Sequence, residues 1–140
     1  MIYKRIFVDS DILLDLLLKR DPFVIYSRAL LADHTQKLVD IYTSTLILAN
    51  VHYVISKQLN KNGALISIKY LMGLVKVLSF EEAQIKAAIN AGHIDFEDSI
   101  QYYIARQNNC DLIISRNTKH YKGLDIPVLT AEEFLRRILL

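Results

Sequence analysis

The sequence predicts a single α/β domain: a three-layer sandwich with helices on both faces of a mostly parallel sheet. Short apolar runs alternate with longer segments of helical periodicity, which is typical of β-α-β units. The chain has 140 residues, enough for one domain with its own core, and we take residues 1–140 as that domain. It is 52% apolar with only 4 Gly and 2 Pro, so no long linker is expected.

The first half of the chain is expected to hold two strands and their helices. Residues 2–8 are apolar enough for a buried strand, and Ser10 can cap a helix that runs to about Lys19. Asp21-Pro22 then begins a second helix to about Gln36, because proline favours the first helical position. A short strand over 40–43 leads into a helix with N-cap choices at Thr43, Ser44 and Thr45. Four residues at helical spacing mark that helix: Leu46, Ala49, Tyr53 and Ser56.

The second half continues the alternation. Asn62-Gly63 is expected to break the chain before a helix to about Lys76, and residues 75–78 form a strand. Ser79 with Glu82 three residues later has the spacing of a capping box for the next helix. Four more elements follow: a helix over 95–108, a strand over 111–115, a strand over 126–129, and a helix capped by Thr130 with Glu133 at its third position.

The composition argues against several classes of protein. A single cysteine, Cys110, excludes an intrachain disulfide framework and is typical of a reducing compartment, so we expect a cytoplasmic protein. Lys4 and Arg5 are followed closely by Asp9, which argues against a signal peptide. No apolar run reaches the roughly 18 residues of a membrane span, so no membrane association is expected. The formal net charge of +2 does not by itself indicate nucleic acid.

Acidic residues stand where an α/β sheet binds ligands. Asp9 follows the apolar run 6–8, and a carboxylate at the end of a buried strand is costly to desolvate unless a partner such as a metal ion compensates. The carboxyl ends of parallel strands also form the ligand-binding edge of such sheets. Asp98 opens a helix whose next residues are mostly apolar or aromatic, so we expect its carboxylate to face a site. Asp9 and Asp98 are therefore predicted to bind metal in one cleft.

Simpler roles remain open for each acid. Asp9 has the position of a helix N-cap, and Asp95 has the same position before the helix that carries Asp98. Asp11 lies in a first helical turn, where the helix dipole alone favours an acid. Asp15, one turn later, is expected on an exposed face outside the cleft.

Three other polar residues are candidates. Asn117 follows a buried strand, and its amide oxygen can ligate a hard metal ion. Asn50 interrupts an apolar turn, which suggests an inward polar contact. His120 could bind a metal or a phosphate or carry a proton, although a loop histidine is more often simply solvated.

Four short motifs together resemble the PIN domain family, metal-dependent ribonucleases that include the toxin halves of many bacterial toxin–antitoxin pairs. The matching segments are Val8 to Asp15, Thr43 to Asn50, Asp95 to Gln101 followed by Ala105, and Asp111 to Asn117 with Tyr121. Each motif is short, but their order covers nearly the whole chain.

The resemblance implies a function and a site. It implies hydrolysis of RNA phosphodiester bonds, an Mg²⁺ or Mn²⁺ ion held by Asp9, Asp98 and Asn117, and Asn50 at the same site. Ser115 or Thr43 would orient a phosphate or water, and Arg116 and Lys119 would hold the RNA backbone. Two positions depart from the family pattern, because Asn50 replaces a glutamate and no aspartate stands at or just after Asn117.

Two other protein classes share part of this acidic pattern. The segment 9–11 imitates the Asp-x-Asp motif of haloacid-dehalogenase-like phosphatases, but their later motifs would occur here in the wrong order. A receiver domain would need a phosphoacceptor aspartate after the strand over 75–78, and none is present. The remaining alternative is a PIN-fold module that binds RNA or protein with weakened or no catalysis. Excess apolar residues over 23–31 and 64–74 predict a homodimer, an antitoxin partner, or both.

Overall fold

The computed structural model describes residues 2–93 and 95–138. Within them a five-stranded sheet has the strand order β3-β2-β1-β4-β5, and each neighbouring pair is parallel. The strands are β1 (Arg5–Val8), β2 (Asp40–Ser44), β3 (Lys76–Leu78), β4 (Leu112–Ile114) and β5 (Val128–Leu129). The predicted α/β class with a mostly parallel sheet is confirmed.

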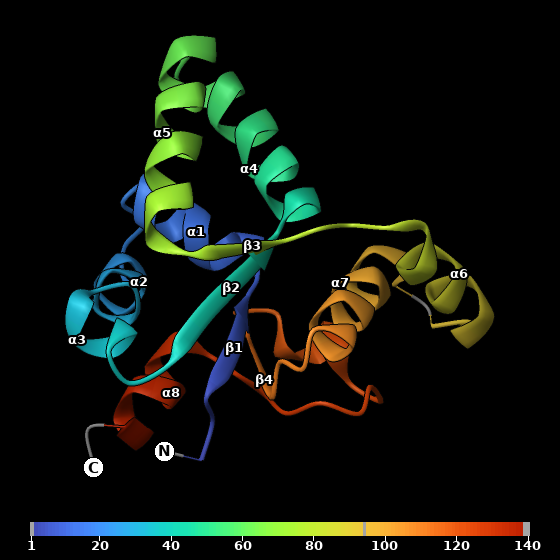
Figure 1. Cartoon of the computed structure of the whole chain (residues 1–140). Helices are drawn as coiled ribbons and strands as arrows, with labels where there is room; N and C mark the ends of the chain where they lie inside the picture. Colours follow the sequence, from blue (N-terminus) through green and yellow to red (C-terminus); the bar gives the residue numbers. More distant parts are fainter. Residues whose placement is uncertain (1, 94, 139–140) are drawn as a thin grey trace.

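Helices cover both faces of this sheet. They are α1 (Ser10–Leu17), α2 (Val24–Leu30), α3 (Asp33–Gln36), α4 (Thr45–Gln58), α5 (Lys61–Leu74), α6 (Glu82–Ala91), α7 (Phe96–Gln107) and α8 (Ala131–Ile138), with a 3-10 turn η1 (Thr118–Tyr121). Figure 1 shows α1, α2 and α8 on one side of the strands and α6 and α7 on the other. None of the helices in the described ranges is long and apolar enough to cross a membrane.

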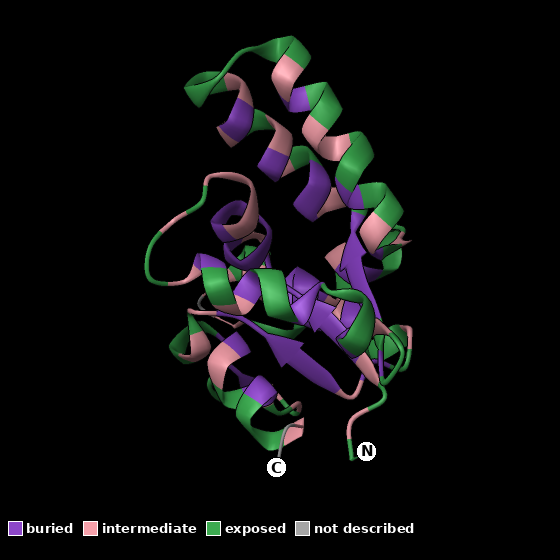
Figure 2. Ribbon diagram, turned by 90° about the vertical axis from the view of Figure 1, so that its left-hand side faces the viewer, coloured by how far each residue is buried: buried purple, intermediate pink, exposed green. Residues whose placement is uncertain are grey.

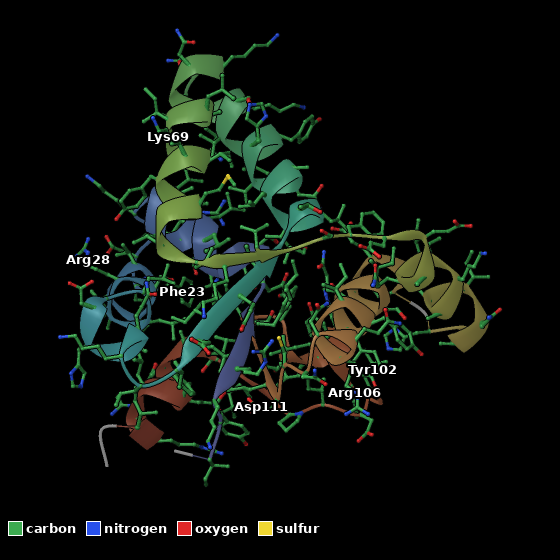
Figure 3. The ribbon with its side chains drawn as sticks, in the orientation of Figure 1. Phe23, Arg28, Lys69, Tyr102, Arg106 and Asp111 are labelled. Atoms are coloured by element: carbon green, nitrogen blue, oxygen red, sulfur yellow. The ribbon has the colours of Figure 1, made fainter. Side chains whose placement is uncertain are left out.

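The central position of β1 explains where a site can form. β1 pairs with β2 on one edge and with β4 on the other, so Val8 lies beside Ile114. The apolar residues of β1 and β4 are fully buried, as expected for strands covered on both faces. Asp111 fixes the other end of this pairing, because its carboxylate accepts hydrogen bonds from the backbone nitrogens of Lys4 and Arg5 (Figure 3). The residues that follow β1 and β4 are thereby brought together.

Helices α4 and α5 form a hairpin that stands out from the body of the molecule (Figures 1 and 2). Ser44 caps α4, and its side chain accepts a hydrogen bond from the Ile47 nitrogen. Asn60 caps α5 by accepting from the Gly63 nitrogen at 2.7 Å. Gly63 therefore lies inside α5, and the break expected at Asn62-Gly63 falls two residues earlier.

Two helix predictions needed further correction. The single helix expected from Asp21-Pro22 to Gln36 is split into α2 and α3, because Thr35 folds back and donates to the Ala29 carbonyl at 2.9 Å. The helix after β3 is capped through Glu81 and Gln84 rather than Ser79 and Glu82.

The predicted cap of α8 is present. The Glu133 nitrogen donates to the Thr130 hydroxyl, and the Thr130 nitrogen donates to the Glu133 carboxylate. Each side chain thus satisfies the backbone of the other, as the sequence spacing predicted.

Candidate metal centre

Asp9 directly follows β1, and both of its carboxylate oxygens accept hydrogen bonds. One carboxylate oxygen, Oδ1, accepts from the Ser10 nitrogen at 2.8 Å and starts α1. The other, Oδ2, accepts from the Ser115 hydroxyl at 2.9 Å and the Tyr121 hydroxyl at 2.8 Å. Asp9 is only 8% exposed. The carboxylate is thus both a helix cap and a fixed, buried acid at the sheet edge.

Asp98 faces this carboxylate from the first turn of α7. Asp95 has the expected cap role, because its Oδ1 accepts from the Asp98 nitrogen at 3.0 Å. Burial and the negative charges of Asp9 and then Asp95 raise the pKa of Asp98 to about 7. The carboxyl group of Asp98 is therefore near enough to Asp9 to interact with its charge. The charge of Asp9 thus reaches a residue about ninety positions away, and the shared metal cleft of Asp9 and Asp98 stays a prediction.

Asp11 adds a third acid. Its Oδ2 accepts from the Arg116 nitrogen at 2.9 Å, and the Ser115 hydroxyl lies 3.4 Å away. Burial and the charge of Asp9 raise the pKa of Asp11 to about 6. The helix dipole does not explain this burial, so Asp11 belongs to the acidic cluster. Sequence reasoning left that role open.

The residues fit a hard divalent cation. Asp11 Oδ1 and Asp98 Oδ2 are buried and form no hydrogen bond with any described residue. A buried carboxylate oxygen without a partner is costly, and a metal ion can remove that cost. Carboxylate oxygens are also the ligands that Mg²⁺ and Mn²⁺ prefer. The cluster therefore has the donor chemistry and the unsatisfied atoms of a metal centre.

Asp15 differs from its prediction. It was expected on an exposed face, but it is 0% exposed and pairs with Arg116 through Nε–Oδ2 and Nη2–Oδ1 contacts of 2.8 and 2.9 Å. Arg20 lies 3.8 Å away as a second cation. The Arg116 guanidinium stacks over the Phe23 ring at 4.0 Å. A two-bond ion pair across 101 residues compensates for burial that helical spacing alone could not show.

Comparison with known proteins identifies the family. The PIN domain model matches residues 5–119, which is most of the chain. The chain belongs to the PIN domain family. Ribonuclease VapC1 of Aquifex aeolicus (strain VF5) is 34% identical over 143 residues, covering 96% of this chain and 95% of that protein.

Solved structures show the same fold at low sequence identity. The VapBC-1 structure from nontypeable Haemophilus influenzae aligns with a TM-score of 0.70 at 17% identity, covering 91% of this chain and 98% of that chain. VapBC2 from Rickettsia felis, bound to a DNA fragment from its promoter, aligns with a TM-score of 0.67 at 15% identity, covering 90% and 98%. These likenesses show the same fold in this chain.

Asn50, which the sequence resemblance sets at the position of the family's glutamate, lies on α4 and is half-buried. Its Nδ2 atom donates to Oε1 of Glu97 at 2.7 Å, which joins α4 to the first turn of α7 beside Asp98. Asn50 thus makes a polar contact with another side chain, but this contact is exposed rather than inward as expected. Glu97 was not among the candidate site residues. Its position next to Asp98, in a first helical turn that carries two acids, was the sequence feature that could have suggested it.

Asn117 lies at the start of η1 and is exposed. Its backbone nitrogen donates to the Ser115 hydroxyl at 3.0 Å. Its side chain lines a cavity of about 330 Å³ with residues of α2 and α8, including Phe23 and Tyr26. Among the described residues no hydrogen bond joins the Asn117 side chain to Asp9 or Asp98, so its ligand role stays a prediction.

Proposed function

We propose that this PIN domain protein is a metal-dependent endoribonuclease and the toxin of a toxin–antitoxin pair, with Asp9, Asp11 and Asp98 at its active centre. The observation that carries the proposal is the pair of buried carboxylate oxygens without hydrogen bonds at the carboxyl edge of the sheet. The 34% identity to a ribonuclease over almost the whole chain supports the choice of substrate.

The protein would hold Mg²⁺ or Mn²⁺ through Asp9 and Asp98, with Asp11 beside them and with Asn117 and Asn50 as further predicted site residues. When bound, such an ion supplies an activated water and neutralises charge on the scissile phosphate. Ser115 and Tyr121 keep the Asp9 carboxylate in place by donating to its Oδ2 atom. The first task of these residues is thus to present fixed oxygens to the ion.

Most of the residues expected to contact the RNA are engaged in other contacts. Arg116 is held by Asp15 and Phe23, so we assign it to the structure of the cleft wall. Ser115 is likewise occupied by Asp9 and by the Asn117 nitrogen. Thr43, the other residue expected to orient phosphate, is buried and donates to the Val8 carbonyl at 3.2 Å. Lys119, exposed on η1, remains the proposed phosphate contact.

The test is cleavage of pooled cellular RNA with Mn²⁺ by the wild type and by Asp9→Asn. We expect Asp9→Asn to reduce cleavage by about a hundredfold or more, because the asparagine lacks the charge that holds the ion. Asp125→Asn, at an exposed position far along the chain, is the matched control and should retain activity. Equal cleavage by the wild type and a folded Asp9→Asn protein would contradict the proposal.

A second candidate is a PIN module that binds RNA or protein without turnover. The amides at Asn50 and Asn117 favour it, because they lower the negative charge available to a cation. Calorimetry with Mn²⁺ separates the two functions. An enzyme should bind Mn²⁺ at millimolar concentrations or tighter and cleave RNA, whereas the binding module should show RNA or protein binding without metal-dependent cleavage.

A protein partner is also part of the proposal. Structural neighbours include complexes described as toxin–antitoxin pairs, among them one from Klebsiella pneumoniae. Apolar side chains exposed on the α4–α5 hairpin offer a surface for an antitoxin or for a second copy of the chain. A homodimer is the arrangement that we propose for the free toxin.

A further inference from the structure

The 3-10 turn η1 brings two consecutive side chains to the carboxylates of the cleft. Tyr121 donates its hydroxyl to Asp9. His120, the residue before it, lies against Asp98 and Asp95 at the start of α7. The turn contacts α7 and follows β4, so the position of His120 is set by the same elements that build the acidic cluster. His120 is therefore not an isolated loop histidine.

The distances around His120 are those of atoms that share a cation. Its Nδ1 atom lies 2.9 Å from Asp98 Oδ2 and 3.9 Å from Asp95 Oδ2. One donor atom from each of the three residues lies within 4.8 Å of the others. Around an octahedral ion with bonds of about 2.1 Å, adjacent ligand atoms are about 3.0 Å apart and opposite ones about 4.2 Å. The 2.9 Å separation matches adjacent ligands, and the 3.9 Å separation lies between the adjacent and opposite values, within reach of one ion.

Hydrogen bonding does not account for the closest contact. Asp98 Oδ2 is buried and has no hydrogen bond of acceptable geometry, although the His120 ring nitrogen is only 2.9 Å away. The Asp98 side chain is 15% exposed, so little water can serve this oxygen. The imidazole nitrogen and the buried carboxylate oxygen thus lie at ion-pair distance without a well-formed hydrogen bond, close enough for both to bind one ion.

We propose that His120 is a ligand of the metal centre together with Asp98 and Asp95, and that it gives the centre a preference for Co²⁺ and similar ions over Mg²⁺. Carboxylates suit Mg²⁺ and Mn²⁺, whereas an imidazole nitrogen favours the later divalent ions of the first transition row. The inference rests on the proposed metal-dependent function and adds a specificity-determining residue to it.

The test is calorimetric titration of the metal-free full chain with Mg²⁺ and with Co²⁺. His120→Asn should lower Co²⁺ affinity about tenfold or more and Mg²⁺ affinity less than about threefold. His120→Asp should bind Mg²⁺ at least as tightly as the wild type but should not restore the lost Co²⁺ affinity. His34→Asn, on the exposed face of α3, is the matched control and should change neither. Nitrogen coupling to bound Mn²⁺ in pulsed electron paramagnetic resonance should be present in the wild type and absent in His120→Asn.

The outcomes separate this inference from the proposed function. Metal binding that is lost in Asp98→Asn but unchanged for both ions in His120→Asn would overturn the role of His120 and leave the metal centre standing. A wild type that binds neither ion would overturn both. Thermal unfolding of each metal-free variant shows whether a loss of metal binding comes only from a loss of the fold. If His120→Asn is unfolded, the metal affinities of His120→Asp provide the test instead.

Discussion

Two hydroxyl groups from distant parts of the chain hold one oxygen of Asp9. Ser115 follows β4 and Tyr121 ends η1, and both donate to Asp9 Oδ2. Neither contact is local in sequence. The sequence motif that includes Tyr121 therefore did not reveal that its hydroxyl binds Asp9. Residues that fix the orientation of a metal-binding carboxylate can affect metal affinity or activity as strongly as residues that contact the substrate.

Tyr121→Phe should therefore destabilise the protein. The substitution removes the hydroxyl that reaches Asp9 but keeps the buried ring. A hydrogen bond to a charged group contributes about 1.5 to 3 kcal/mol, so the free energy of unfolding should fall by roughly that amount. Urea unfolding measures it, with Tyr70→Phe on the exposed face of α5 as the control. Equal losses in the two variants would contradict the role given to the Tyr121 hydroxyl.

The acidic cluster predicts an unusual pH dependence for the metal-free protein. The pKa of Asp98 is about 7 in the fold against 3.8 for an ordinary aspartate, so the folded state binds a proton that the unfolded state releases. Stability should fall as pH rises from about 4 to about 7 and should stay lower above that range. Asp98→Asn should remove most of this fall and be the more stable protein at pH 8.

Chemical unfolding at pH 5 and pH 8 in the presence of a chelator is the measurement. Saturating Mn²⁺ should raise wild-type stability more at pH 8 than at pH 5, because the ion competes with the proton for Asp98. Wild-type stability that increases steadily over this range, with Asp98→Asn showing the same increase, would refute the close approach of Asp9 and Asp98.

Asn50→Glu tests how near Asn50 lies to the ion. The new carboxylate would add a negative charge beside Glu97, the present partner of Asn50. Metal affinity should rise roughly tenfold, and metal-free stability should fall because like charges then meet. Asn62→Glu adds the same charge at an exposed position of α5 and should leave the affinity unchanged. Equal Mn²⁺ affinity in the wild type and Asn50→Glu would place Asn50 away from the ion.

At the scale of elements, helix α1 depends on an ion pair with the segment after β4. Asp15 is buried among apolar residues of α1, and Arg116 pairs with it through two contacts. Asp15→Asn should lower the free energy of unfolding by roughly 2 to 4 kcal/mol, since a partly buried cation loses its partner. Urea unfolding of Asp15→Asn and of Asp33→Asn, an exposed acid on α3, checks this. A loss no larger than that of the control would mean that the pair contributes little.

The elements themselves could be largely predicted from the sequence, whereas some boundaries could not. Thr130 and Glu133 predicted their cap correctly because a capping box involves residues three positions apart. The separation of α2 from α3 was missed because it depends on the Thr35 side chain reaching Ala29. The burial of Asp15 was missed because its partner lies about a hundred residues away. Local rules succeed where the contact is local.

At the scale of the molecule, the exposed face of α5 is the clearest sign of association. Leu65, Ile66, Tyr70 and Met72 are all exposed there, around Lys69, which lies on the same helix (Figure 3). Exposed apolar residues in this number on one helix usually mark a surface that binds protein. Over the segment 23–31, by contrast, only Ile25 is a large exposed apolar residue. The predicted excess of apolar side chains over 64–74 is therefore exposed, whereas the large apolar side chains over 23–31 are mostly at least partly buried.

Ile66→Glu should weaken self-association of the chain. Ile66 is 71% exposed, so its replacement costs the monomer little stability while placing a charge in the proposed interface. Sedimentation velocity over a range of concentrations should show a dimer for the wild type and a monomer for Ile66→Glu. Ile89→Glu, at a similarly exposed position on α6, should behave like the wild type. A wild type that remains monomeric at high concentration would count against a homodimer.

The candidate site was predictable from the sequence only in part. Asp9 and Asp98 stood out because each acid adjoins an apolar element, which is unfavourable without a ligand. The packing of His120 against Asp98, and the link from Asn50 to Glu97, depend on how η1, α4 and α7 meet in space. These contacts between elements depend on the order of the strands in the sheet, and the pattern of apolar residues along the sequence does not specify that order.

The strand order also has a consequence for the cell that makes this protein. β1 is synthesised before its neighbour β4 and before the hydroxyls that hold Asp9, which come more than a hundred residues later. A nascent chain on the ribosome therefore carries Asp9 without these partners until residues 112–121 have been synthesised. The acidic site can assemble only after that segment is available.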